Sequence, residues 1–278
     1  MVRKKNNKKE DILVATIFEQ VLFTTLRIEC INENGNLFSI GTGFLLQRPV
    51  GEDKYKVYLI SNKHVLCNAN SITITFTKSK HNNPDLGNTV RIPITDIKDS
   101  IVQHPNPNID IAILECTRLF IMFPNQLYFK TVDYDMLASF DEPELSIAEN
   151  VFFVGYPDNR YDKQNNLPLI RTGMIASHPK YNYNGDDVFI IDAQVFPGSS
   201  GSPVYIDLTY ENFKNGQINL GKKDIKLLGI VSATMIRNNQ IKSIQTGTQL
   251  LSEEILGLGI VYKATAIKEL IDSMPTDN

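Results

Sequence analysis

The feature that most constrains the fold is a succession of short β-type runs along the chain. The runs are rich in β-branched and aromatic residues, and Asn, Asp, Gly or Pro bound each of them. They cover residues 38–46, 55–61, 71–77, 109–114, 150–154, 188–193, 225–233 and 258–262. Because turns separate the runs, the sequence predicts an all-β sandwich or barrel and not a series of βαβ units.

Helical signals are few. Residues 265–274 predict a C-terminal helix, with Thr265 as the N-cap and Pro275 as the stop. Residues 11–25 fit a helix or a strand, because their periodicity does not separate the two. Segments rich in Asn, Asp and Lys are expected to be surface loops, namely residues 81–88, 158–167 and 209–224.

Length and charge limit the possible classes. The 278 residues include 42% hydrophobic side chains, which is enough for one large domain or two tightly joined lobes. Residues 1–10 carry a basic cluster in an Asn-rich leader, and we expect a disordered, solvated tail there. The net charge of −3 argues against a dedicated nucleic-acid binder, which needs a concentrated basic face.

Cysteine usage indicates a reducing compartment. Cys30, Cys67 and Cys116 are odd in number and show no paired spacing, whereas a secreted protein of this size would carry several disulfides. The apolar stretch at residues 12–26 contains Glu19 and lacks the cleavage pattern of a signal peptide. No run approaches the ~20 apolar residues that cross a bilayer. We therefore expect a cytoplasmic protein without a membrane partner.

The strongest chemical signal is residues 196–203, Phe-Pro-Gly-Ser-Ser-Gly-Ser-Pro, between two β-type runs. Attack on a peptide carbonyl needs a serine oxygen on a tight turn and N–H groups aimed at the developing oxyanion. Gly198 and Gly201 permit such a turn, because glycine adopts backbone conformations closed to other residues. The sequence predicts Ser200 as a nucleophile, with the N–H groups of Gly198 and Ser200 as the oxyanion hole. Taken alone, the segment also fits an ordinary Ser/Gly-rich turn.

A serine nucleophile needs a base, and the chain has four histidines. None follows Ser200, which excludes the chain order of α/β-hydrolases. His64 is the best candidate, because it lies where an apolar β-type run gives way to a turn. His81 and His104 are expected to be solvent-exposed in polar loops, and His178 to be structural.

The base in turn needs a carboxylate that fixes its tautomer. Asp110 is the candidate, because it lies among apolar residues at the start of the run 109–114. A carboxylate in such a place is costly without a partner. The structural alternative is an ion pair with an Arg or Lys.

These segments, in the order His64, Asp110 and Ser200, resemble the chymotrypsin-like (trypsin-like) serine proteases. The resemblance is closest to the bacterial high-temperature-requirement, or Deg-type, branch, and it spans roughly residues 21–273. It rests on six motifs in the expected order, at residues 41–46, 62–65, 110–114, 192–201, 228–232 and 257–261. The chain stops after the predicted helix, so we expect no C-terminal PDZ domain.

The resemblance implies two six-stranded antiparallel β-barrels followed by a C-terminal helix. The domain is expected over residues 11–278, with lobes at about 11–130 and 131–278, and no cofactor or metal is implied. Gln194 stands where trypsin-like relatives carry the acid at the base of the specificity pocket, so a strict preference for Lys or Arg is not expected. The residues expected to bind substrate are Gln194, Pro197, Ser232, Ala233 and Thr234.

The leading hypothesis is an active serine endopeptidase that acts on a protein or peptide and is regulated, or narrowly specific, through a partner or through loop ordering near Gly198. The alternative is a binding or scaffold protein on an inactive protease fold. A metal-dependent hydrolase lacks an H-E-x-x-H motif, and His64 with Cys67 gives only two ligands. A cysteine nucleophile is poorly supported, because no cysteine lies in a glycine-flanked turn.

Overall fold

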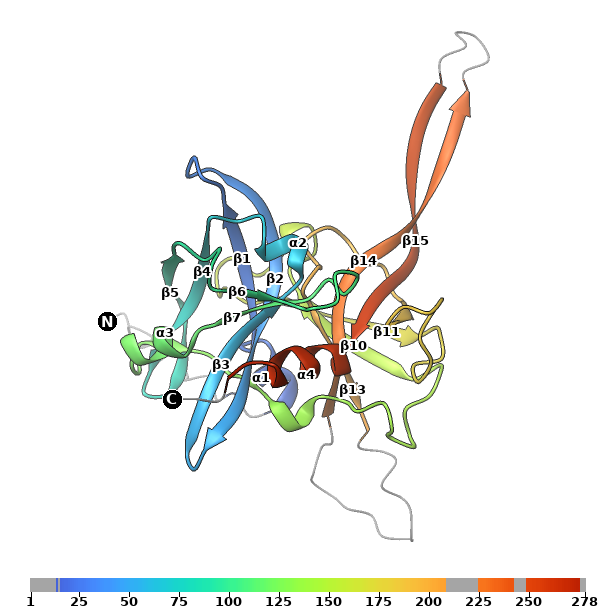
Figure 1. Cartoon of the computed structure of the whole chain (residues 1–278). Coiled ribbons are helices and arrows are strands. Elements are labelled where there is room, and N and C mark those ends of the chain that lie inside the picture. The colour runs from blue at the N-terminus through green and yellow to red at the C-terminus, as the bar shows by residue number, and fades with distance from the viewer. Residues whose placement is uncertain (1–13, 15, 209–224, 243–248, 276–278) are drawn as a thin grey trace, which may run out of the picture.

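The computed structural model describes residues 14, 16–208, 225–242 and 249–275, and it forms two lobes of β-structure (Figure 1). The expected basic tail at residues 1–10 and the expected loop at 209–224 lie outside these residues. The first lobe contains β1 (Thr25–Ile31), β2 (Leu37–Gly51), β3 (Lys54–Ser61), β4 (Ser71–Lys80), β5 (Asn83–Ile94), β6 (Ile101–Gln103), β7 (Ala112–Glu115), β8 (Leu127–Tyr128) and β9 (Val132–Asp133).

The sheet of the first lobe is not a closed barrel. Seven of its nine strands follow the order β5-β4-β1-β2-β3-β7-β6, while β8 pairs with β4 and β9 pairs with β2 in parallel. The expectation of a six-stranded antiparallel barrel is therefore wrong for this lobe. β6 has only three residues, and the chain between β5 and β6 turns through Asp96 at a φ of 54°, so the two ends of the sheet do not pair.

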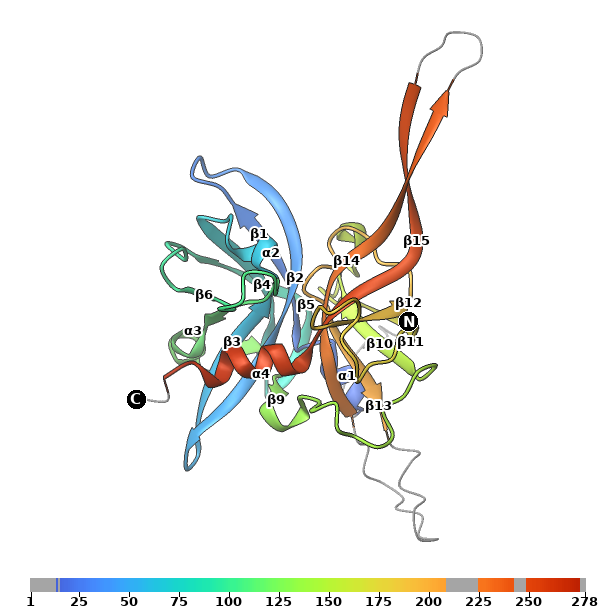
Figure 2. The same cartoon turned by 45° about the vertical axis from the view of Figure 1, so that its right-hand side comes forward.

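The second lobe is a closed six-stranded barrel of order β10-β11-β12-β15-β14-β13, which confirms the expectation there. Every neighbouring pair in it is antiparallel. Its strands are β10 (Asn150–Gly155), β11 (Leu169–Ile175), β12 (Val188–Asp192), β13 (Pro203–Asp207), β14 (Ile225–Lys242) and β15 (Gln249–Lys263). β14 and β15 extend well beyond the barrel, as two views 45° apart show (Figures 1 and 2).

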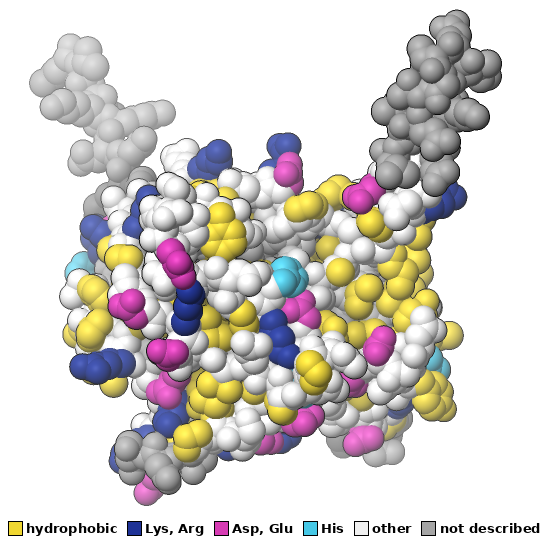
Figure 3. All heavy atoms as spheres, turned by 45° about the horizontal axis from the view of Figure 1, so that its top comes forward, with side chains coloured by type: hydrophobic (Ala, Val, Ile, Leu, Met, Phe, Trp, Pro, Cys, Tyr) yellow, Lys and Arg dark blue, Asp and Glu magenta, His cyan; other side chains and the backbone are white. Residues whose placement is uncertain are grey.

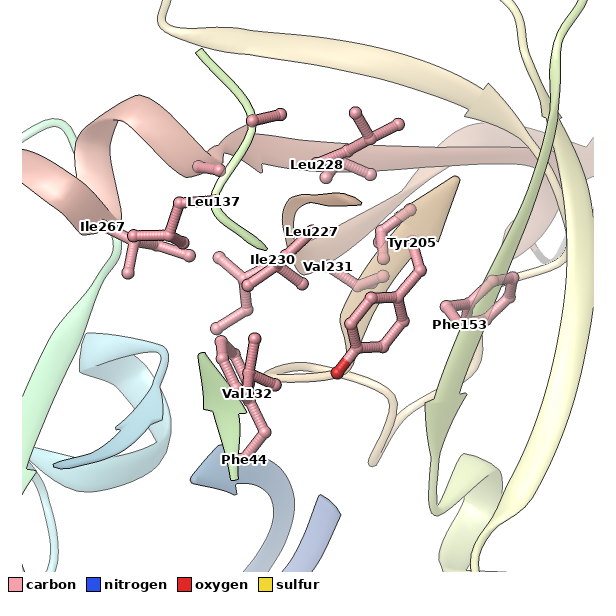
Figure 4. Packing of buried hydrophobic residues seen from close by; sticks show 14 of the residues in the cluster. Phe44, Val132, Leu137, Phe153, Tyr205, Leu227, Leu228, Ile230, Val231 and Ile267 are labelled. Atoms are coloured by element: carbon pink, nitrogen blue, oxygen red, sulfur yellow. The ribbon is translucent and has the colours of Figure 1, made fainter. Parts of the chain in front are cut away.

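One hydrophobic core joins the lobes. Phe44 of β2 and Val132 of β9 meet Leu227 and Ile230 of β14, and Ile267 of the C-terminal helix packs beside them (Figure 4). A second cluster, which includes Ile28 and Phe76, lies within the first lobe. Each fully buried aliphatic or aromatic side chain contributes about 1.5–3 kcal/mol, so the shared core holds the lobes together.

The helices are short. They are α1 (Ile17–Val21), α2 (Lys63–Leu66), α3 (Thr117–Met122) and α4 (Ala264–Asp272), with 3-10 turns η1 (Tyr134–Met136) and η2 (Pro157–Asn159). The C-terminal helix is confirmed, but its N-cap is Lys263 and not Thr265, because β15 continues to Lys263. Residues 11–25 contain both alternatives, since α1 ends at Val21 and β1 begins at Thr25. Among the described helices, none is long and apolar enough to span a bilayer.

The loop expected at residues 81–88 is largely a strand. His81 and Asn82 adopt positive φ angles of 52° and 61° and form a two-residue turn, so that Asn83 of β5 pairs with Lys80 of β4. The polar composition of this segment masked a hairpin. β11 was also missed by the sequence patterns.

Candidate active site

The candidate residues come from four segments that the fold brings together. His64 lies on α2, which follows β3, and Asp110 lies in the turn before β7. Ser200 lies in the turn between β12 and β13 of the barrel, and Ser232 lies in β14. The first lobe thus supplies the histidine and the aspartate, and the second lobe supplies the two serines.

His64 and Asp110 form a close pair. The Nδ1 atom of His64 lies 2.6 Å from Oδ2 of Asp110, and the backbone N–H of His64 donates to Oδ1 at 3.1 Å. The carboxylate therefore accepts Nδ1–H, which leaves Nε2 to act as a base. The His64 side chain is 49% exposed and that of Asp110 is 23% exposed.

Asp110 is held by more than His64. The Ser232 hydroxyl donates to its Oδ2 at 2.8 Å, and the side-chain amide of Asn62 donates to its backbone carbonyl at 2.7 Å. Burial alone would raise the pKa of Asp110. The hydrogen bond and charge of His64, the Ser232 hydroxyl and the His64 N–H outweigh burial, and the pKa lies below its ordinary value. The site therefore favours a charged Asp110.

The Ser200 hydroxyl donates to the backbone carbonyl of Ser232 at 2.9 Å. Ser232 thus contacts Ser200 through its carbonyl and Asp110 through its hydroxyl. Within the described residues, no hydrogen bond joins Ser200 Oγ to the His64 ring. Catalytic hydrogen bonds are often long or misaligned before substrate binds, and rotation about χ1 redirects a serine hydroxyl.

The turn that carries Ser200 is held by backbone contacts. Gly201 has a φ of 92°, and a Cβ atom there would lie 1.7 Å from the carbonyl oxygen of Thr42. The Thr42 N–H donates to the Ser200 carbonyl at 2.9 Å, and the Gly201 N–H donates to the carbonyl of Val231 at 2.9 Å. Only glycine fits position 201, so the turn is tied to both lobes at once.

The expected oxyanion donors are unpaired. In the part of the chain that the structure describes, no acceptor takes the N–H of Gly198 or of Ser200. The Pro197 carbonyl accepts the Asp158 N–H at 2.7 Å, and the Gly198 carbonyl accepts the Thr42 hydroxyl at 2.7 Å. Because C=O and N–H point in opposite directions across a trans peptide, the bond to Pro197 sets the direction of the Gly198 N–H.

The expected substrate-binding residues fall into two groups. Gln194 and Pro197 are exposed on the loop before Ser200, and Ala233 and Thr234 follow Ser232 on β14. Ser232 itself is 8% exposed, and its hydroxyl faces Asp110 instead of lining a pocket. A groove of about 350 Å³ includes Pro197 and Gly198 of the turn in its lining, together with Leu37, Phe38, Ser39, Ile40, Asp158 and Asn159.

The other histidines lie apart from this site, and one expectation about them is wrong. His104 is 3% exposed, not solvent-exposed, and its Nε2 lies 3.6 Å from Glu269 of α4. The neighbours of His104 in the sequence are polar and did not reveal its burial beside Glu269. His81 and His178 are exposed.

The cysteines are free thiols. Burial raises the pKa of Cys30 to about 12 and that of Cys116 to about 12, which disfavours the nucleophilic thiolate. Burial, as the largest cause, also raises the pKa of Cys67. Within the described ranges, no three His, Cys, Asp or Glu side chains gather to hold a metal ion.

Sequence reasoning missed three contributors. The Ser232 hydroxyl was expected to line a pocket, and Thr42 and Asn62 were given no role. Thr42 stands between two glycines, and Asn62 lies two residues before His64. Both positions carried a signal, but only the fold shows which backbone groups their side chains contact.

The chain is similar to several solved structures. The chain is similar to a structure named HBP, with a TM-score of 0.52 and 8% identity, over 93% of this chain and 94% of that one. It is also similar to the Rv3671c protease of M. tuberculosis in its active form, with a TM-score of 0.46 and 17% identity, over 93% and 83% of the two chains. The scabies mite inactivated protease paralogue S-I1 gives a TM-score of 0.47 and 14% identity, over 92% and 97%. At 8% identity, the likeness to HBP shows the fold alone.

The family follows from the sequence comparison. Residues 41–209, more than half of the chain, match the trypsin-like peptidase domain. No curated protein matches the sequence. The matched region includes His64, Asp110 and Ser200, together with the Thr42 and Gly201 contacts that hold the turn. The chain therefore belongs to the family of trypsin-like peptidase domains and has a mostly β, chymotrypsin-like fold.

Proposed function

We propose that the protein is a serine endopeptidase that hydrolyses protein or peptide substrates, with residues 11–278 as the protease domain and lobes at about 11–130 and 131–278. Ser200 is the nucleophile, His64 the base and then the acid, and Asp110 the group that orients His64. Family membership supports a serine peptidase, and the arrangement of these side chains supports their roles.

The observation that carries the proposal is a set of hydrogen bonds in which Ser232 contacts both Asp110 and Ser200 through two different groups. It runs from His64 to Asp110 at 2.6 Å, from Asp110 to the Ser232 hydroxyl at 2.8 Å, and from the Ser232 carbonyl to Ser200 at 2.9 Å. Through these contacts, Ser232 links the base, the carboxylate and the nucleophile across the two lobes. This arrangement also leaves His64 Nε2 free of any described partner.

The mechanism follows from this geometry. Ser200 Oγ attacks the carbonyl carbon of the scissile bond while His64 Nε2 takes its proton, and the N–H groups of Gly198 and Ser200 stabilise the oxyanion. Collapse of the intermediate breaks the C–N bond, and His64 returns the proton to the leaving amine. Water, activated by His64, then hydrolyses the acyl-Ser200 ester and regenerates the hydroxyl.

We propose that the pocket for the residue before the cleaved bond takes a neutral side chain of small or medium size. Gln194, Pro197, Ala233 and Thr234 carry no charge, which supports this preference. Ser232 contributes its backbone, since its hydroxyl is engaged by Asp110.

We further propose a cytoplasmic protease that is narrowly specific or controlled by a regulatory protein. The basis is the cysteine usage, because all three thiols are free. The unpaired N–H of Gly198 supports control at the oxyanion loop, since a rotated peptide there would switch the site off.

Labelling with a fluorophosphonate probe tests the proposal. The wild-type chain should be labelled at Ser200, and Ser200→Ala should lose both the label and about six orders of magnitude of peptide cleavage. Ser202→Ala is a matched control, because Ser202 lies in the same turn and is fully buried. Undiminished cleavage by Ser200→Ala would refute the assignment.

The second candidate is a binding or scaffold protein on a protease fold. The observation in its favour is that Ser200 donates to the Ser232 carbonyl and not to His64. A correctly folded wild-type chain that the probe fails to label at any pH from about 6 to 9, where an imidazole base is active, would support this candidate.

A further inference from the structure

β14 and β15 leave the barrel as a two-stranded arm, defined here as residues 234–242 and 249–257 (Figures 1 and 2). The strands stay paired in register from Ile236 opposite Ile255 to Lys242 opposite Gln249. An isolated two-stranded ribbon is marginally stable in water. A ribbon of this length is therefore a candidate for binding another chain segment.

Among the described residues, the outer edge of β14 in the arm is free, and that of β15 is free up to Leu256, because the Gly257 carbonyl accepts the Ala193 N–H at 2.9 Å. The ladder between β13 and β14 ends at Pro203 opposite Ile230, and the ladder between β12 and β15 ends at Asp192 opposite Leu258. Beyond these points, none of the strands that the structure describes pairs with either edge of the arm. A free edge presents unpaired N–H and C=O groups to any extended peptide.

The β14 edge starts at the candidate active site. The Ser232 carbonyl accepts the Ser200 hydroxyl at 2.9 Å, and β14 continues from Ser232 directly into the arm. A peptide with its scissile bond at Ser200 therefore lies at the foot of this edge. The register between β14 and β15 shifts between Val231 and Ala233 and again between Thr234 and Ile236, but β14 remains one strand to Lys242, so an extended peptide that follows its edge reaches the arm.

We propose that the β14 edge of the arm, from Ile236 outward, binds an extended segment of the substrate that lies beyond about the fourth residue upstream of the cleaved bond, as an added antiparallel strand; this inference rests on the proposed function. All neighbouring strands in the barrel are antiparallel, and β14 runs outward from Ser232. An antiparallel partner runs inward and reaches Ser200 with its C-terminal end. The arm thus takes the residues on the N-terminal side of the cleaved bond.

The side chains of the arm define the chemistry of that segment. Ile236 and Ile255 lie opposite each other and are 45% and 40% exposed, and Leu256 is 46% exposed. Arg237 and Glu254 pair on the other face. Hydrophobic surface also gathers beneath the arm on the right of Figure 3. The segment should be extended, with apolar side chains at alternate positions, one of which packs on Ile236, whose other neighbour is Ile255.

A shortened arm tests the inference. Replacing residues 238–253 with Asn-Gly joins Arg237 to Glu254, which face each other, through a two-residue turn. Peptides that the wild-type chain cleaves are first selected from a random library. Each is then synthesised with about four or about twelve residues upstream of the cleaved bond. The longer peptides reach along the arm, because an extended chain rises about 3.3 Å per residue. The variant should lose about 10-fold or more in kcat/KM on the longer peptides only, because several main-chain hydrogen bonds are lost. Equal losses on both lengths, or none, would overturn the inference.

Main-chain pairing has a periodic signature. Methylating successive backbone nitrogens upstream of about the fourth residue should slow cleavage at every second position in the wild-type chain, and at none in the shortened variant, because alternate N–H groups face the edge. Ile236→Ser should lower kcat/KM on the longer peptides more than Ile121→Ser does. Ile121 is the control, because it is an equally apolar side chain, 72% exposed, that lies on α3. A flat methylation profile would overturn the inference.

Two further measurements separate the competing explanations. Sedimentation should give the same oligomeric state for both chains; a wild-type dimer that dissociates on shortening would assign the arm to a second copy and overturn the inference. Absence of fluorophosphonate labelling in the wild-type chain would refute the proposed function alone. In that case, binding of library peptides to the immobilised proteins still tests the arm. Peptides that bind the wild-type chain and not the shortened variant would support binding by the arm, and equal binding to both would overturn the inference.

Discussion

The two halves of the candidate site are held in different ways. The Ser200 turn is fixed by backbone contacts, with Gly201 against the Thr42 carbonyl and the Ser200 carbonyl on the Thr42 N–H. The His64–Asp110 pair is fixed by side chains, and the His64 ring is about half exposed. The turn forms part of the contact between the two lobes, whereas the side chains of the pair are partly exposed to solvent.

This difference separates stability from chemistry. A change in the turn disturbs backbone that both lobes share, so it should alter folding and activity together. A change in the pair removes a partly exposed contact, which contributes little to folding. The pair should therefore tolerate substitution structurally while losing catalysis, and the turn should not.

The largest effect is expected at the pair. On the proposed mechanism, His64→Ala should lower kcat/KM by about six orders of magnitude, because the group that takes the Ser200 proton is removed. Asp110→Asn should lower it by about four orders, because an amide whose oxygen accepts the His64 backbone N–H turns its NH2 donor toward Nδ1, and the wrong tautomer results. Steady-state kinetics measure the loss of activity in each variant, and thermal unfolding measures the change in stability. Tm should move by only a few degrees; collapse of the fold in either variant would contradict the separation.

The second prediction concerns the turn. Gly201→Ala should destabilise the protein by about 3 kcal/mol or more, because the new Cβ meets the Thr42 carbonyl and the backbone has a positive φ. Gly185→Ala is the matched control, since Gly185 has a φ of 90° but no atom lies within 4 Å of the Cβ position. The control should lose only about 1–2 kcal/mol from its backbone conformation. Urea unfolding compares the two, and equal losses would show that the lobes do not clamp the turn.

The third prediction addresses Thr42, which links the turn to the first lobe. Its hydroxyl donates to the Gly198 carbonyl and accepts the Tyr156 N–H at 3.2 Å. Thr42→Val keeps the shape but leaves both groups unpaired, so stability should fall by about 1–3 kcal/mol. Activity should fall about 10-fold through the displaced Gly198, a smaller loss than removal of an oxyanion donor itself. Thr42→Ser keeps the hydroxyl and should restore most of both; failure of this rescue would assign the effect to the methyl group.

The same contrast explains what the sequence predicted. The Ser200 turn was predictable because Gly198 and Gly201 lie close to Ser200 in the sequence, and glycine at these positions indicates the backbone conformation of the turn. Asp110 was predictable because its apolar neighbours made an unpartnered carboxylate costly. The β-type runs, the closed second barrel and the C-terminal helix follow from local patterns and the resemblance.

Features that depend on distant residues were not predictable. Closure of the first sheet depends on whether β5 meets β6, and no pattern within either strand encodes this pairing. The burial of His104 depends on α4, which lies far along the chain. Likewise, the contact of Ser232 with Asp110 joins residues 122 positions apart. The paired arm is a further case, because the strand signals stopped at residue 233 while β14 continues to Lys242.

The smallest effect is expected at Ser232, where the two halves of the site meet. Ser232→Ala removes the hydroxyl that donates to Asp110 but keeps the carbonyl that accepts from Ser200. The hydroxyl helps to lower the pKa of Asp110 against the opposing effect of burial, so the pKa should rise in the variant. Activity should fall by less than about 10-fold, because one neutral donor is lost while the His64 contact remains.

The pH dependence gives this prediction a sign. A carboxylate with a lowered pKa in the folded state stabilises the protein above its unfolded-state pKa, and this contribution is lost as pH falls through the folded-state pKa. Raising the folded-state pKa in Ser232→Ala reduces the contribution, by about 1 kcal/mol. The variant should therefore be less stable than wild type near neutral pH, and the gap in Tm should close in acid, where Asp110 is protonated in both states. A gap that widens as pH falls would mean that the Ser232 hydroxyl acts on a group other than Asp110, and the link between the two halves would be lost.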